Sequence, residues 1–188
     1  MQIVVTDEMK RVAKTEAHRR NPYITHHFEV KHFSKEERNV VGFLGEFAAC
    51  ALFGIDWRRN IRDDYVTIDT GDIQVGTAII DVKTETVPKW ALQKIVTRQI
   101  DDDGPYGRRL INENQVPLLH KYDYVLFSGF LRNDLSYWYP FGYVATDYVL
   151  QNYSVTTERP DGGTYPEAAM PVRTSSLRNV IELMRSVT

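Results

Sequence analysis

The sequence predicts a mixed α/β fold of the α+β kind, with a central mixed sheet flanked by helices. Residues 40–55 (VVGFLGEFAACALFGI) are apolar or small except for Glu46, which is typical of a buried helix. Residues 73–84 form two strand-like runs around Gly76-Thr77, which is typical of a hairpin. With 188 residues and 43% hydrophobic content, the chain can bury one substantial core, so we expect a single domain over residues 1–188.

The N-terminal residues 1–34 are expected to form an appendage to that domain. A short helix is predicted near Asp7 to Arg19, with a break at Asn21-Pro22. Three roles stay open for this segment: covering the core, contacting a substrate, or mediating dimerisation. Ser34 followed by Glu37 offers a capping box at the start of the first core helix.

The core helix carries one acid, Glu46, in otherwise apolar surroundings. An ionised carboxylate is costly there unless it meets a cation or several donors, so we expect Glu46 at a helix edge that faces a polar site. The alternative is a glutamate that reaches solvent or pairs with a nearby arginine. Cys50 lies on the same helix and is predicted to be a core residue. Because it is the chain's one cysteine, no internal disulfide forms, and a reducing compartment is expected.

The next segment predicts a strand, a turn and a hairpin. Tyr65–Ile68 alternates as a strand does, and Thr70-Gly71 predicts a turn. Asp72 follows where the next strand begins. Asp81 and Lys83 lie on the returning strand with their side chains on one face. The hairpin is therefore expected to bring Asp72 beside Asp81 across the ladder.

The second half of the chain supplies further elements of the sheet and its helices. Residues 88–100 show helical spacing and are expected to pack on the sheet. Tyr122–Phe130 predicts a buried central strand and Trp138–Ala145 another. Capping residues predict a short helix over residues 146–151 and a final helix from Leu177 to Met184.

Three other groups of polar residues are expected to have no metal-binding role. Asp101-Asp102-Asp103-Gly104 has neither the ligand spacing nor the closing glutamate of an EF-hand, so we expect an exposed loop. Arg108 and Arg109 are expected in a glycine-rich loop. The pair His26-His27 and His32 lack the spacing and cysteine partner of a zinc site, so surface or packing positions are expected.

The acids of the helix and the hairpin together predict a site for Mg²⁺ or Mn²⁺, which prefer oxygen ligands. Asp72 and Asp81 are the expected principal ligands, with Glu46 and the backbone carbonyl of Val82 as further ones. Hydrolysis of a phosphodiester needs such a cation to neutralise the developing charge and to activate water. Lys83 would orient that water or stabilise the charged transition state. The predicted catalytic residues are therefore Glu46, Asp72, Asp81 and Lys83.

This arrangement resembles the PD-(D/E)XK nuclease superfamily over roughly residues 36–86. Gly71-Asp72 stands for the first motif, Asp81-Val82-Lys83 for the second, and Glu46 for the helix acid. Gly71 replaces the proline of the name, which carries no chemistry. The resemblance implies a restriction-endonuclease-like αβββαβ core, magnesium-binding acids, and hydrolysis of phosphodiester bonds in nucleic acid. It does not identify the substrate.

The expected partner is nucleic acid, with DNA favoured over RNA. Arg58, Arg59 and Arg62 are candidate phosphate contacts, because they join the Glu46 helix to the hairpin. A net charge of −2 argues neither for nor against nucleic acid. No apolar run has the length of a membrane span and the start is too short for a signal sequence, so a soluble cytoplasmic protein is expected, without a membrane partner.

Three questions stay open from the sequence. A homodimer is one, since many relatives cut two strands with paired active sites. A non-catalytic nucleic-acid-binding or structural protein on the same scaffold is the main alternative function. A metal-dependent hydrolase of another phosphate ester is a further one.

Overall fold

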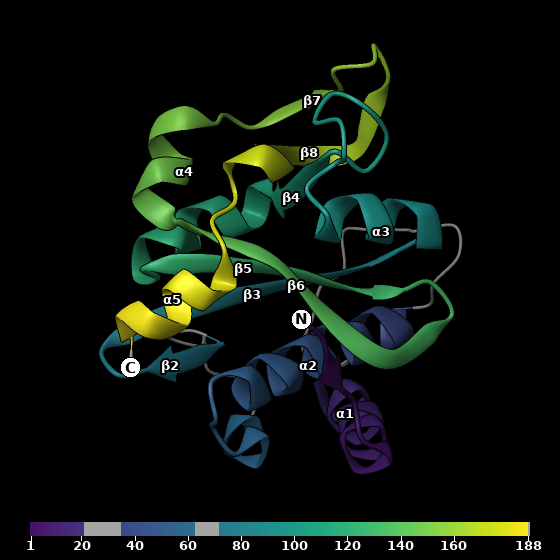
Figure 1. The fold of residues 1–188 in the computed structure, drawn as a ribbon, viewed down its shortest axis with the longest axis vertical. Helices are drawn as coiled ribbons and strands as arrows, with labels where there is room; N and C mark the ends of the chain where they lie inside the picture. The colour runs from purple at the N-terminus through teal and green to yellow at the C-terminus, as the bar shows by residue number, and fades with distance from the viewer. Residues whose placement is uncertain (21–34, 63–71, 188) are drawn as a thin grey trace.

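The protein has a mixed α/β fold in which a curled mixed sheet is flanked by helices (Figure 1). The computed structural model describes residues 1–20, 35–62 and 72–187. Several expectations fall outside these ranges: the strand Tyr65–Ile68, the turn Thr70-Gly71, the break Asn21-Pro22, the capping Ser34, and the three histidines at 26, 27 and 32.

The larger sheet has five strands in the spatial order β1, β6, β5, β3, β2. They span Ile3–Val4 (β1), Ile73–Val75 (β2), Ala78–Val87 (β3), Tyr124–Leu131 (β5) and Asp134–Ala145 (β6). β3 runs parallel to β5, and the other neighbours pair antiparallel. The predicted hairpin is confirmed: Val75 pairs with Ala78, and Gly76 turns the chain with φ of 59°, which glycine tolerates. The predicted central strand is β5, which lies between β3 and β6.

Two helices cover one face of this sheet, α1 (Asp7–Arg20) and α2 (Lys35–Leu52), as Figure 1 shows. A short 3₁₀ helix, η2 (Trp57–Asn60), follows α2. α1 buries Met9, Ala13 and Ala17 in the same core as α2 and the sheet. The described part of the N-terminal segment therefore shares the central core, and β1 extends the sheet beside β6.

A second layer covers the opposite face of the sheet (Figure 1). Its elements are α3 (Lys89–Val96), β4 (Arg108–Asn112), the 3₁₀ helix η3 (Glu113–Lys121), α4 (Thr146–Asn152), β7 (Thr156–Glu158), β8 (Thr164–Arg173) and the 3₁₀ turn η4 (Thr174–Ser176). The final helix, α5 (Val180–Val187), instead buries Val180 and Leu183 in the core that α1 and α2 share with the sheet. β4, β8 and β7 form a separate three-stranded antiparallel sheet. The sequence patterns did not predict this sheet.

Three sequence expectations need correction. Arg108 and Arg109 open strand β4 and do not lie in a loop, because the Arg109 guanidinium is buried against Glu85 and the ring of Phe141. The final helix begins at Val180 and not at Leu177, since residues 177–179 are held extended by a bridge between Tyr143 and Arg178. Helix α3 ends at Val96, before the left-handed Arg98.

In the part of the chain that the structure describes, no helix combines the length and the apolar character needed to cross a membrane.

Candidate functional site

Asp72 lies where strand β2 separates from β3. The ladder pairs Ile73 with Ile80, so Asp72 occupies the next position, facing Asp81. β2 begins at Ile73, whereas β3 runs on to Val87. The Asp72 carboxylate continues the pairing beyond the strand end, since its Oδ2 accepts a hydrogen bond of 2.7 Å from the backbone N–H of Val82.

Asp81 and Lys83 lie on one face of β3 and contact each other. Lys83 Nζ donates to Asp81 Oδ1 at 2.8 Å. The second oxygen of Asp81, Oδ2, is buried and accepts no hydrogen bond from the described residues. A buried carboxylate oxygen without a donor is costly, and such atoms call for a ligand or ion.

Glu46 projects from α2 towards the same place and is 5% exposed. Asn60 Nδ2 donates to its Oε2 at 2.7 Å. Arg62 Nη2 lies 3.8 Å from Glu46 Oε2 and 3.7 Å from Asp72 Oδ1, so one guanidinium joins the helix acid to the hairpin acid. The site thus brings together the four predicted catalytic residues from α2, the start of β2 and β3.

Burial and two neighbouring acids act on Asp72. Burial raises the pKa of Asp72 well above its ordinary value, and the charges of Glu46 and Asp81 raise it further, against Lys83 and the Val82 N–H. For Lys83, burial acts to lower the pKa, but Asp81 and Asp72 outweigh it and the net pKa is raised. Lys83 therefore stays protonated, and the carboxylates repel one another in a place that favours a cation.

The three predicted phosphate-contact arginines have different surroundings. Arg58 is engaged with acids of its own chain, Glu8 at 2.7 Å and Asp56 at 3.3 Å. Arg59 lines a cleft of about 330 Å³ beside the acids. Arg62 lies among the carboxylates themselves. Arg59 and Arg62 are thus the two that lie beside the candidate site.

The cleft is bounded by residues of α2, η2, β2 and β3, namely Cys50, Ile55, Arg59, Asn60, Asp72, Ile73, Gln74 and Ile79. Burial raises the pKa of the Cys50 thiol from 9.0 to about 12, and the charges of Glu46 and Asp72 add to this. A thiol in this state is a neutral core group and a poor nucleophile.

As placed in the structure, the described residues form no group of three or more His, Cys, Asp or Glu side chains that could hold a metal ion. Partners of the acids include Arg62, Asn60, Lys83 and the Val82 N–H. At Val82 the backbone N–H, rather than the carbonyl, contacts an acid of the site, since it donates to Asp72.

Asn60, a partner of the site, and Glu85, which follows the site along β3, were missed from the sequence. The contact of Asn60 with Glu46 depends on how η2 folds back on α2, and no local sequence pattern predicts that. Glu85 follows Lys83 by two residues and so shares its face of β3, a spacing that could have been noticed. Glu85 is paired with the buried Arg109. Burial raises the pKa of Glu85, against the effect of Arg109.

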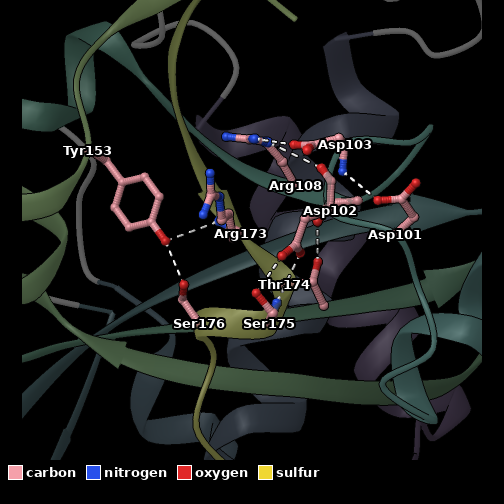
Figure 2. Close-up of polar contacts among 10 residues, drawn as sticks. Asp101, Asp102, Asp103, Arg108, Tyr153, Arg173, Thr174, Ser175 and Ser176 are labelled. Atoms are coloured by element: carbon pink, nitrogen blue, oxygen red, sulfur yellow. Dashed lines mark hydrogen bonds and ion pairs between the residues drawn. The ribbon is translucent and has the colours of Figure 1, made fainter. Parts of the chain in front are cut away.

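The acidic triplet 101–103 uses its carboxylates within the chain (Figure 2). Asp101 accepts a hydrogen bond from the N–H of Asp103 at 3.0 Å, and Asp103 pairs with Arg108 at 2.5 Å. Asp102 accepts hydrogen bonds from the N–H of Ser175, at 3.0 Å, and from its hydroxyl. Through Asp102, the turn that contains the triplet is hydrogen-bonded to η4.

Comparisons with protein-family models, with curated proteins and with solved structures find no match to this chain.

Proposed function

We propose that this protein is a metal-dependent nuclease of the PD-(D/E)XK type that hydrolyses phosphodiester bonds, with DNA the favoured substrate. The observation that carries the proposal is that Asp72 and Asp81 face each other across a hairpin. Lys83 forms an ion pair with Asp81, and Arg62 lies between Asp72 and Glu46. A carboxylate cluster with a protonated lysine matches the needs of phosphodiester hydrolysis.

The order of the described elements supports the restriction-endonuclease-like core. The acid-bearing helix α2 precedes the hairpin β2–β3, and α3, β4 and η3 then lead to β5, which pairs parallel to β3. β4 belongs to the smaller sheet, so α3 is the α-helix between the two neighbouring strands of the larger sheet. That sequence agrees with the later part of an αβββαβ arrangement. The first of its three strands, expected at Tyr65–Ile68, lies outside the described residues.

Three features of the site suit a Mg²⁺ or Mn²⁺ ion. Asp81 has a buried oxygen without a donor, Asp72 is destabilised in its charged form by two neighbouring acids, and the donors are hard oxygens. Asp72 and Asp81 would hold the ion, with Glu46 and the Val82 carbonyl as further ligands. When bound, the ion supplies charge neutralisation and a lowered pKa for the attacking water.

The remaining groups act on the substrate and the water directly. Lys83, kept protonated by Asp81 and Asp72, can donate a hydrogen bond to the attacking water or to a phosphate oxygen. Arg59, at the cleft wall, is placed to contact a flanking phosphate. Arg62 would exchange its contacts with Glu46 and Asp72 for contacts with phosphate oxygens as the ion takes over those acids.

One observation favours the second candidate, a non-catalytic nucleic-acid-binding scaffold. Arg62 and Lys83 already neutralise the acids within the chain, so the cluster can persist as a structural ion-pair network. On this reading the protein binds nucleic acid but does not cut it.

The test is cleavage of single-stranded DNA, duplex DNA and RNA with Mg²⁺, Mn²⁺ or EDTA. Wild type should cut at least one substrate with metal and none with EDTA. Asp81→Asn and Lys83→Ala should each lose about 100-fold or more in rate. Asp147→Asn, an exposed acid in the first turn of α4, is the matched control and should retain full activity. Binding without cleavage under every condition would favour the non-catalytic scaffold.

A further inference from the structure

An aromatic pair, with one exposed ring and one half-buried ring, lies beyond the end of β3, on the side that leads away from the carboxylates. Trp90, in the first turn of α3, is 46% exposed. Its ring centre lies 5.6 Å from that of Tyr106 in an edge-to-face contact. Large aromatic side chains that remain accessible in this way are enriched at binding surfaces.

Two cations accompany the two rings. Lys94 Nζ lies 5.9 Å from the centre of the Trp90 ring, and the Arg132 guanidinium lies 5.9 Å from that of Tyr106. Arg132 Nη2 also donates to the Tyr106 hydroxyl at 2.6 Å. Within the described chain, neither Lys94 nor Arg132 forms an ion pair with an acid. Their charges therefore remain available to an anionic ligand.

The position of Tyr106 is fixed by an unusual backbone. Its φ of 61° lies in the left-handed region, which a bulky side chain rarely adopts. Its carbonyl accepts a hydrogen bond from the buried Arg109. At Gly107 a Cβ would lie 2.0 Å from the Asp101 carbonyl oxygen, and the Thr174 hydroxyl binds the Gly107 carbonyl at 2.6 Å. Figure 2 shows how η4 and the acidic turn are tied together here. Such over-determined strain is typical of functional positions.

A cavity lies beside Tyr106 and reaches Glu85 of β3. Tyr106 lines a cavity of about 350 Å³ whose wall includes Arg108, Arg159, Tyr165 and Glu85. Glu85 lies on the same face of β3 as Lys83, about 7 Å further along the strand. A nucleic-acid strand that passes Lys83 and follows this face of β3 would therefore reach the cavity that Tyr106 lines. Trp90 contacts Tyr106 and would lie next along the same path.

We propose that Trp90 and Tyr106 form a stacking surface for unpaired bases, with Lys94 and Arg132 contacting the phosphates of the same segment. The inference rests on the proposed nuclease function and deepens it by naming the substrate class, a nucleic acid with a single-stranded part. Only unpaired bases offer a face to a side-chain ring, because paired bases are stacked within a duplex. The two uncompensated cations favour a nucleic acid over a protein partner.

The test is binding of a labelled single-stranded oligonucleotide and of a blunt duplex, measured by fluorescence anisotropy in EDTA. Trp90→Ala should weaken single-strand binding about 5- to 100-fold, and Trp90→Phe should restore most of it. Duplex binding should change little. Tyr148→Ala removes a comparably exposed ring on α4, 43% exposed, and should leave both affinities unchanged. Lys94→Gln should weaken binding. The slope of log affinity against log salt concentration should become shallower by about the amount that one phosphate contact contributes.

Unchanged single-strand affinity in Trp90→Ala would overturn the inference, even if cleavage proceeds and the nuclease proposal stands. A loss of self-association in Trp90→Ala, seen by sedimentation without any loss of single-strand affinity, would also overturn it by assigning the surface to a second copy of the chain. Conversely, Trp90-dependent binding without cleavage of any substrate would remove the nuclease proposal and leave the stacking surface as part of a binding protein.

Discussion

Three carboxylates and two cations share the space where β2 separates from β3. The charged form of Asp72 is disfavoured in this arrangement, because burial, Glu46 and Asp81 all act against its charge. Its one backbone partner, the Val82 N–H, needs only an acceptor. The residue therefore carries a charge that the metal-free fold does not need, which is a common feature of functional sites.

Replacing Asp72 with asparagine should stabilise the metal-free protein. The amide oxygen can still accept the Val82 N–H, while the repulsion from Glu46 and Asp81 is removed. We expect a gain of about 1 kcal/mol in the free energy of unfolding, measured by urea denaturation in EDTA. Adding Mg²⁺ should then stabilise the wild type more than Asp72→Asn. A less stable variant in EDTA would show that the charge itself is structural.

Cys50 should be inert towards thiol reagents in the native protein. Its side chain is 2% exposed, and burial with the neighbouring acids raises its pKa to about 12, so almost no thiolate forms at pH 8. Labelling by an aromatic disulfide should be slow in buffer and fast in denaturant. Fast labelling of the folded chain would mean that α2 opens at the cleft.

Glu85 predicts a pH dependence of stability. Burial raises the pKa of Glu85 in the folded state, so at a pH between its unfolded and folded pKa the folded chain binds more protons than the unfolded chain. The stabilising contribution of Glu85 is therefore present below its unfolded pKa and is lost as the pH rises through its folded pKa. The free energy of unfolding of wild type minus that of Glu85→Gln should therefore decrease from about pH 4 upwards. A difference that increases with pH would show that the Arg109 pair outweighs burial.

At the scale of elements, α2 approaches β3 through a glycine. A Cβ at Gly45 would lie 1.8 Å from the Thr84 hydroxyl oxygen, so no larger residue fits without moving the helix. This contact sets the depth of α2, and hence of Glu46, which follows Gly45 in the chain.

Gly45→Ala should lower the free energy of unfolding by about 1–3 kcal/mol and should reduce any activity that depends on Glu46. Gly42→Ala is the matched control on the same helix. A Cβ at Gly42 meets nothing within 4 Å, so helix propensity alone should leave stability unchanged or raise it by up to about 1 kcal/mol. Thermal unfolding of both variants decides this. Equal effects would show that the approach of α2 to β3 is not tight.

Prediction from sequence worked where local patterns carry the information. The hairpin at Gly76, the apolar helix around Glu46 and the central strand β5 each have a periodicity or turn signal of their own. Strand β4 of the smaller sheet does not, since it pairs with β8 across about 60 residues and begins with two arginines. Arg109 is buried by its partner Glu85, a contact that only the folded chain creates.

The same distinction holds for the candidate site. The alternation of Asp81, Val82 and Lys83 places the acid and the lysine on one face, and the hairpin register places Asp72 opposite Asp81. Which cation meets Glu46 could not be read from the sequence. Arg62 was expected at phosphates, yet it lies between Glu46 and Asp72, because η2 returns the chain to α2.

At the scale of the whole molecule, the N-terminal segment tests how the core is assembled. Residues 1–20 bury Val5, Met9, Ala13 and Ala17 in the core shared by α2 and the larger sheet. Deleting residues 1–20 should therefore expose that core and cost several kcal/mol, giving a broad unfolding transition or aggregation. The measurement is urea unfolding followed by circular dichroism. A deleted chain that unfolds cooperatively at the wild-type midpoint would show that these residues are an appendage.

The central claim is that Asp72, Asp81 and Lys83 form one metal-dependent catalytic centre. The most direct measurement is the cleavage rate of the best substrate as Mg²⁺ is titrated from zero, for wild type, Asp81→Asn and the control Asp147→Asn. We predict a saturable rise in rate for wild type and control, and a rate at least about 100-fold lower for Asp81→Asn at every Mg²⁺ concentration. Cleavage that is independent of Mg²⁺, or that survives in Asp81→Asn, would contradict the account.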